Sequence, residues 1–275
     1  MNRVTGTGVI VCMLFASGAQ AVTDVDGQNG GGLVPWALLS SGPTVAISHL
    51  GTQNLGIDGV AINTSFADRV EVSYAHNTLA VTGGRAGLTD AVDNFGLKVK
   101  LNDMGDVMPQ FAIGVVNKQT SGALADTLNK ALGISTSSTD IYGAASKIVN
   151  VGGKNVLLNG VLRATKANQM GLLGFGGGTA AGAKTGYSVE PEASVEVFAA
   201  ENVVVGAEYR AQPSNGVTAT DAVLHQNAAY DLHIAYVANK NLTWTAGYAS
   251  LGQVDPGALG SYNQHGMFLQ AQASF

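Results

Sequence analysis

The sequence predicts a transmembrane antiparallel β-barrel of about twelve strands in the outer membrane of a Gram-negative bacterium. Three features predict this all-β fold: segments of roughly ten residues with alternating apolar and polar side chains, connections that are alternately short and long, and a final strand that ends on Phe275. Charged residues make up only 12% of the chain, against about 25% in soluble proteins. No apolar run approaches the roughly 20 residues that a spanning helix requires.

The first 21 residues predict a cleaved signal peptide. Arg3 supplies a weakly positive start, Val9 to Ala16 forms a short apolar core, and Ala19-Gln20-Ala21 fits a small-x-small cleavage pattern. The mature chain is then expected to begin at Val22. The single cysteine, Cys12, falls in the removed part, which excludes disulfides, a thiol nucleophile and a Cys-ligated metal site.

A Gly-rich segment, residues 22–42, precedes the predicted barrel of residues 43–275. Its composition is compatible with a periplasmic tail, with a plug inside the barrel, or, for part of it, with an extension of the first strand.

Alternation with period two defines the strands. It is clearest at Asn241 to Gly252, where Leu242, Trp244 and Tyr248 share a face. The same pattern predicts outward aromatic residues suited to the membrane interfaces, namely Trp244, Tyr248, Tyr230, Tyr236, Tyr209 and Phe95. The predicted strands are 43–50, 56–66, 68–79, 92–102, 108–119, 138–150, 154–166, 187–199, 202–212, 227–239, 241–251 and 265–275.

The connections give the predicted barrel a direction. Short turns alternate with stretches near 80–91, 120–137, 167–186, 213–226 and 252–264, as expected for short periplasmic turns and long outer loops. An even number of strands then places both termini in the periplasm. One outer loop predicts a helix, because Leu124, Leu128 and Leu132 are spaced four apart before Gly133. The helix either narrows the barrel mouth or lies on the surface.

The final strand indicates how the chain reaches its membrane. Met267, Leu269 and Phe275 share one face, and Gln270 and Gln272 make the other face polar. An alternating last strand with a terminal aromatic residue is what the barrel-insertion machinery recognises, so that machinery and outer-membrane lipid are the expected partners.

Charged residues at the predicted inward positions define a candidate lumen. They are tolerable only away from lipid. Those of the earlier strands are mostly basic and those of the later strands mostly acidic, which suggests either a transverse field across a water-filled constriction or a lumen closed by salt bridges. The predicted set is Arg69, Glu71, Lys98, Lys100, Lys118, Lys147, Arg163, Glu190, Glu192, Glu196, Glu208, Arg210, Asp231 and His233.

Other chemistries find little support. The formal charge of −5 and the lack of a basic run argue against a nucleic-acid partner. Outer-membrane acyl hydrolases pair Ser with a nearby His, but no His-x-Ser pattern occurs, so we predict no enzyme activity and no catalytic residues. No spacing predicts a metal or cofactor site.

Four stretches resemble a bacterial family catalogued only as a domain of unknown function. They are Gly32 to Ala37, Asn159 to Gly177, Val205 to Asn215 and Gly266 to Phe275. Such families are similar to small outer-membrane barrels, including channels. The resemblance implies a barrel and brings no activity, substrate or site residues.

A narrow channel for passive passage of small solutes is therefore the favoured function. The alternatives are a non-transporting structural or interaction barrel and, less favoured, an outer-membrane lipid or ester hydrolase.

Overall fold

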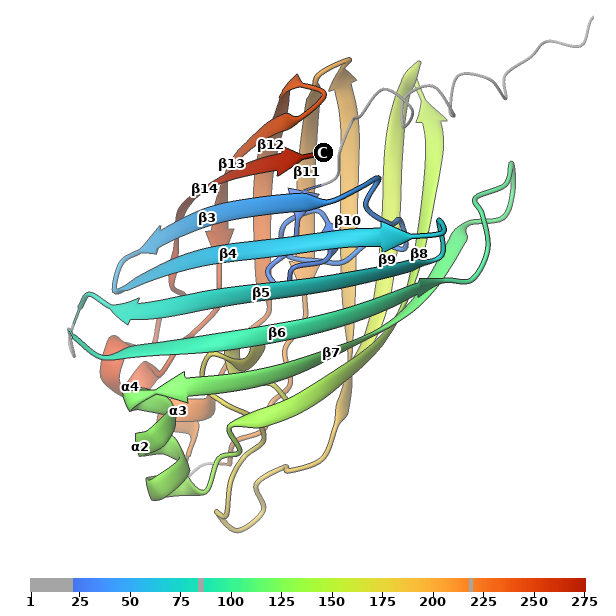
Figure 1. Cartoon of the computed structure of the whole chain (residues 1–275). Coiled ribbons are helices and arrows are strands. Elements are labelled where there is room, and N and C mark those ends of the chain that lie inside the picture. Colours follow the sequence, from blue (N-terminus) through green and yellow to red (C-terminus); the bar gives the residue numbers. More distant parts are fainter. Residues whose placement is uncertain (1–21, 84–86, 218–219) are drawn as a thin grey trace, which may run out of the picture.

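Twelve antiparallel strands close into one barrel in the computed structural model, which describes residues 22–83, 87–217 and 220–275 (Figure 1). The expected signal peptide lies outside the described residues. The strands are β3 (Thr44–Thr52), β4 (Leu55–Phe66), β5 (Val70–Val81), β6 (Thr89–Lys100), β7 (Gln110–Gly122), β8 (Ser137–Val151), β9 (Lys154–Thr165), β10 (Ser188–Ala200), β11 (Val203–Arg210), β12 (Ala229–Asn239), β13 (Leu242–Ser250) and β14 (His265–Ser274). The predicted fold class and number of strands are confirmed.

Each strand pairs with its neighbours in the sequence, and the last strand closes the barrel on the first. The closing register places Leu269 opposite His49 and Ser274 opposite Thr44. Closure leaves no strand of the barrel with an unpaired edge, which a lipid environment requires because it offers no water to exposed backbone groups.

The alternation of the strands turns apolar side chains outward and polar side chains inward. In β12, Leu232 and Ile234 are 60% and 54% exposed, whereas Asp231 and His233, which alternate with them, are buried. The six outward aromatic residues predicted from the sequence are exposed as well. A soluble protein has the opposite arrangement. Apolar exterior, polar interior and closed barrel together make this an outer-membrane protein.

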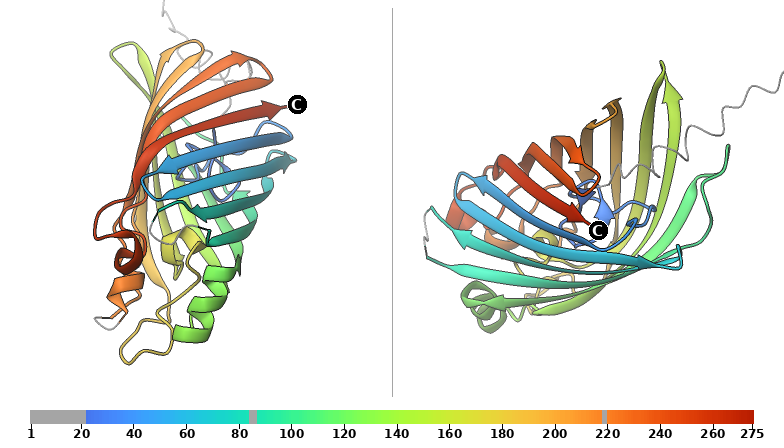
Figure 2. Two further views of the ribbon diagram at one scale, coloured as in Figure 1. Left: turned by 90° about the vertical axis from the view of Figure 1, so that its left-hand side faces the viewer. Right: turned by 45° about the horizontal axis from the view of Figure 1, so that its top comes forward.

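The two ends of the barrel differ in structure. Short turns lie at the end where Phe275 stands, and the helices lie at the other (Figures 1 and 2). None of the helices in the described residues is long and apolar enough to cross a membrane. The helices are α2 (Ala123–Leu132), η1 (Asn168–Gly171), α3 (Asp221–Leu224) and α4 (Pro256–Leu259). Helix α2 forms where the leucine spacing predicts it and ends at Gly133, whose φ of 68° is left-handed and whose N–H bonds to Asn129 O.

The loops at the helical end meet in an apolar cluster, which we call the loop cap. Leucines of α2 and of the loops pack there against the inward side chains at the ends of β4 and β5. Helix α2 thus contributes to covering the barrel mouth. The members of the loop cap are Leu55, Leu79, Val81, Leu124, Leu128, Ile134, Leu173, Leu224, Val254 and Leu259.

Residues 22–42 run inside the barrel and form what we call the lumenal segment (Figures 1 and 2). Its two short strands, β1 (Val22–Thr23) and β2 (Asn29–Gly30), pair with each other. Most of the segment is buried, including Val34 and Trp36. Of the arrangements that the sequence leaves open, the structure has the one in which this segment fills the lumen.

Candidate functional site

Asp26 of the lumenal segment lies at the centre of the charged inner wall. Its carboxylate contacts three cations from alternate strands: Lys118 Nζ of β7 at 2.7 Å, Arg163 Nη1 of β9 at 3.1 Å and Arg210 Nη2 of β11 at 3.1 Å. All four side chains are buried. Inward positions on alternate strands bring these cations together around Asp26 although they are far apart in the sequence.

Two wall carboxylates complete this group, which we call the Asp26 cluster. Asp140 lies 3.2 Å from Lys118, and Glu192 binds Arg163 Nε at 2.5 Å and Arg210 Nε at 3.3 Å. Three cations thus meet three carboxylates. Burial alone would raise the pKa of Asp26, but the charges of Arg210, Lys118 and Arg163 hold it well below its usual range. The segment therefore carries a carboxylate that neutralises the wall.

A second anchor joins the lumenal segment to β5 and β6. Glu71 accepts hydrogen bonds from the backbone N–H groups of Asn29 at 2.9 Å and Ser40 at 2.8 Å, and it pairs with Lys98 at 3.0 Å. The Lys98 ammonium donates in turn to the carbonyls of Asn29 and Leu38, each at 3.0 Å. One buried ion pair thus serves backbone donors and acceptors at Asn29, Leu38 and Ser40.

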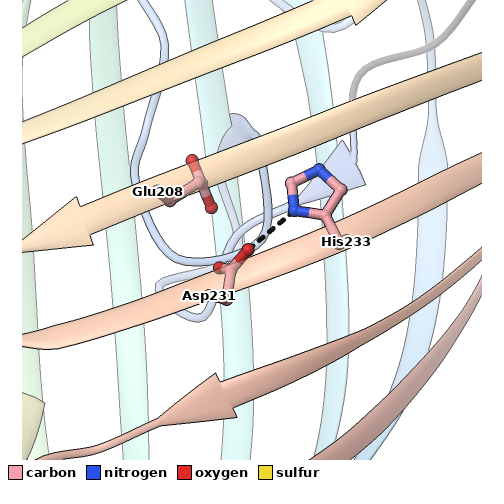
Figure 3. A group of neighbouring side chains, drawn as sticks. All are labelled: Glu208, Asp231 and His233. Carbon is pink, nitrogen blue, oxygen red and sulfur yellow. Dashed lines mark hydrogen bonds and ion pairs between the residues drawn. The ribbon is translucent and has the colours of Figure 1, made fainter.

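A third group lies on β10, β11 and β12 and is shown in part in Figure 3. His233 Nδ1 is 2.7 Å from Asp231, and Nε2 is 3.2 Å from Glu196. Glu208 accepts hydrogen bonds from the N–H of Leu33 at 2.6 Å and from the hydroxyl of Ser194 at 2.7 Å. We call Glu196, Glu208, Asp231 and His233 the carboxylate–histidine cluster.

Neutral wall side chains bind the rest of the segment. Asn159 donates to Pro35 O, Asn63 to Gly27 O, and Tyr142 to Gln28 Oε1. Close approach explains one of the glycines, because a Cβ at Gly31 would collide with the carboxylate of Glu208. The segment thus touches the wall through polar contacts along much of its length.

Asp24 is the second buried carboxyl group of the segment. Burial and the nearby charge of Asp26 raise its pKa to about 7, although the Gln28 N–H bonds to Oδ1 at 2.7 Å and lowers it. Its other oxygen has no hydrogen-bond partner. A cavity of about 110 Å³ lies beside it, between the segment and the wall around β3, β4 and β14, and Asp231 lines the same cavity. This space is large enough for several water molecules.

Most of the lumen residues predicted from the sequence do point inward. Glu190 lies on the same face of β10 but is half-exposed near the strand end. The buried residues of the predicted set are Glu71, Lys98, Lys100, Lys118, Arg163, Glu192, Glu196, Glu208, Arg210, Asp231 and His233.

Two predictions are wrong. Arg69 belongs to the turn before β5 and is exposed, with Nη1 donating to Leu101 O. Residues Ala67 and Asp68 of this turn have positive φ, so strand alternation does not extend to Arg69. Lys147 stands on the outward pleat of β8, opposite in direction to Ser146, and its ammonium binds turn carbonyls of residues 105 and 106.

The sequence interpretation missed Asp24, Asp26 and Asp140. The first two lie in a segment without strand alternation, so no periodicity assigns them a direction. Asp140 does alternate with Tyr142 and Ser146 on β8, and that pattern was sufficient to find it. With these carboxylates in place, the wall charges form ion pairs, as in the second of the two arrangements suggested by the sequence.

Several solved structures of outer-membrane proteins are similar to this chain. The KdgM porin in complex with disordered oligogalacturonate aligns with a TM-score of 0.49 at 11% identity, over 84% of this chain and 99% of that chain. Acinetobacter baumannii Omp33 gives 0.43 at 10% identity (85% and 98%), and Escherichia coli outer membrane phospholipase A gives 0.43 at 9% identity (85% and 96%).

A search of curated proteins finds no match. A family described as "Protein of unknown function (DUF3034)" matches residues 19–272. This confirms the resemblance noted in the sequence, and the chain belongs to that family.

Proposed function

We propose that the protein is a narrow channel for passive passage of small solutes and that the lumenal segment is its plug. The observation that supports this is the polar contact between segment and wall. Asp26, the backbone around Asn29 and the Leu33 N–H bind to charged wall side chains, while Leu33, Val34 and Ala37 pack in the apolar part of the interior. Charged wall side chains of this kind can be hydrated once the segment leaves the lumen.

Departure of the segment leaves the barrel itself intact. The strand ladder does not pass through residues 22–42, so closure of the barrel does not depend on them. Lys118, Arg163 and Arg210 exchange Asp26 for water and mobile anions. Buried ion pairs contribute little net stability against a solvated alternative, so a polar plug can leave at a smaller cost than an apolar core.

The same ion pairs support the second candidate, a barrel that transports nothing and uses these charges as interior packing. The hydrolase alternative draws less support. His49, His76 and His233 each pair with an aspartate, and His265 contacts Gln53 and Tyr248. These contacts do not assemble a serine nucleophile with a histidine base.

Single-channel conductance in planar bilayers tests the proposal. We compare the mature chain with Asp26→Ala and with a chain lacking residues 22–42, each shown to be folded and inserted. Discrete openings that become more frequent in both variants support the channel. In the deletion background, Arg163→Gln with Arg210→Gln should shift selectivity towards cations, whereas Lys147→Gln, on the outward face, should not.

The loop cap requires its own control. Leu124→Ser with Leu128→Ser, added to the deletion, separates closure by the loops from closure by the wall. A folded, inserted barrel that stays silent in all these variants contradicts the channel and favours the non-transporting barrel.

A further inference from the structure

The carboxylate–histidine cluster is assembled by the register of three strands. Glu196 lies opposite Gly206, which lies opposite His233, and in the next row Glu208 lies opposite Asp231. A Cβ at position 206 would collide with Glu196 Oε2 and with the imidazole of His233. Glycine at the middle position thus allows a carboxylate and an imidazole to meet across β11.

The charges of this cluster do not balance. It holds three carboxylates and one imidazole, all buried, so it carries a net charge of −2 even with a protonated histidine. Among the ion pairs of the described residues, none joins a lysine or arginine to Glu196, Glu208 or Asp231. The Asp26 cluster, in contrast, pairs three cations with three carboxylates. Uncompensated buried charge is costly, so this group requires a cation or bound protons.

Glu196 adds to this charge imbalance. Its side chain is 99% buried against strand β11, since only 1% of its surface is exposed. Oε1 has no hydrogen-bond partner, and Oε2 has only the ion pair with His233 Nε2 at 3.2 Å. Buried carboxylate oxygens normally accept hydrogen bonds or coordinate metals.

We propose that the carboxylate–histidine cluster binds one divalent transition-metal ion, with Glu208, Asp231 and the Nδ1 atom of His233 as ligands and Glu196 holding the opposite ring nitrogen, Nε2, as an outer partner that orients the imidazole (Figure 3). Carboxylate oxygens with one imidazole nitrogen suit Zn²⁺, Mn²⁺ or Fe²⁺, while the imidazole disfavours Ca²⁺ and Mg²⁺. This site does not depend on whether the barrel conducts.

The geometry is close to that of a coordination sphere. One ligand atom from each of Glu208, Asp231 and His233 can be chosen so that all lie within 4.8 Å of one another. Tetrahedral bonds of about 2.0–2.2 Å place two ligands of the same ion about 3.3–3.6 Å apart, so binding requires the side chains to move by up to about 1 Å. The cavity lined by Asp231 gives an ion and its water room to approach.

Metal titration of the refolded full mature chain tests this site. After treatment with a chelator and its removal, Zn²⁺, Mn²⁺, Co²⁺, Ca²⁺ and Mg²⁺ are titrated separately by calorimetry, and Co²⁺ also by visible absorption. We expect one Zn²⁺ per chain, a higher unfolding temperature with Zn²⁺, and Co²⁺ bands typical of mixed nitrogen and oxygen ligands. Glu196→Gln and His233→Gln should weaken Zn²⁺ binding at least tenfold.

A matched control is available on the outer surface. His49 and Asp58 have the same Nδ1–Oδ1 distance of 2.7 Å, but both are exposed. His49→Gln with Asp58→Asn should leave Zn²⁺ affinity unchanged. If a cluster variant fails to fold, the Zn²⁺ stoichiometry and the Co²⁺ spectrum of the unaltered chain still show whether it binds a metal ion through nitrogen and oxygen ligands.

Three results overturn the proposal. The first is a folded chain that binds no Zn²⁺, Mn²⁺ or Co²⁺ up to about 1 mM. The second is binding of Ca²⁺ or Mg²⁺ in preference to the transition metals. The third is Zn²⁺ binding that the His49 and Asp58 control abolishes and the cluster variants leave intact.

Discussion

The loop cap and the lumenal segment close the same barrel with different proportions of apolar and polar contact. The cap buries leucines such as Leu124, Leu173 and Leu259 against one another, and its stability comes from removing apolar surface from water. The segment also buries apolar side chains, namely Leu33, Val34 and Ala37, but most of its contacts with the wall join charged and polar groups that water can satisfy as well. The segment is therefore the closure that we expect to open at the smaller cost, because much of what it exposes is polar, whereas opening the cap exposes mainly apolar surface.

Asp26→Ala is expected to have the largest effect on the segment. This substitution leaves three buried cations, Lys118, Arg163 and Arg210, with only the two wall carboxylates of the Asp26 cluster. Removing one partner of a buried ion pair destabilises the state with the segment in place by about 3–5 kcal/mol. The population with the segment released should therefore rise by at least ~100-fold. Trp36, one of two tryptophans, is buried in the segment and reports this by its emission in a Trp244→Phe background.

The control for that experiment is Asp58→Asn, which alters an exposed carboxylate on the outer face. Its Trp36 emission should match that of the parent. Unchanged emission in Asp26→Ala would show that the Asp26 cluster does not hold the segment.

Leu173→Ala tests the apolar half of the comparison. Leu173 is buried in the loop cap, and truncating a buried leucine costs about 2–5 kcal/mol. Because the loop cap then opens more often, a protease should cleave the 166–187 loop faster in detergent. Trp36 emission should not change, because the lumenal segment stays in place. The control is Leu232→Ala on the lipid-facing side of β12, which is 60% exposed. Release of Trp36 by the cap variant would mean that the two closures are coupled.

Strand alternation explains why the barrel could be predicted from the sequence. A pleated strand has only two directions for a side chain, so Leu232 and Asp231 must point to opposite faces. Each strand pairs with the strands next to it in the sequence, so the order of the strands in the barrel follows directly from the chain. The buried positions of Asp231 and His233 follow from the same rule.

The rule fails where a strand ends or where no strand exists. Arg69 lies in a turn and Lys147 on the outward pleat near a strand end, where its long side chain reaches turn carbonyls. Charge alone was a poor guide there. Asp26 has no periodicity around it, so its three cationic partners follow only from the closed barrel.

Asp24 provides the smallest and sharpest test, a dependence on pH. Its pKa is raised from 3.8 to about 7 by burial and by the charge of Asp26. A raised carboxyl pKa means that the folded state binds the proton more tightly, so this stabilisation is complete below pH 4 and is lost as the pH rises through 7. From pH 6 to pH 8 retention of the segment should weaken about tenfold, or ~1.4 kcal/mol.

Trp36 emission measured across that range in the presence of a chelator detects the change. The Asp24→Asn side chain cannot titrate, so its Trp36 emission should not change with pH. The emission should equal that of the parent at low pH, because the amide resembles the protonated acid in shape and charge. Asp103→Asn is the control, because Asp103 lies in an exposed turn where Lys100 lowers its pKa. A parent whose segment is held more tightly at pH 8 than at pH 6 would mean that the wall cations, and not the burial of Asp24, dominate the titration.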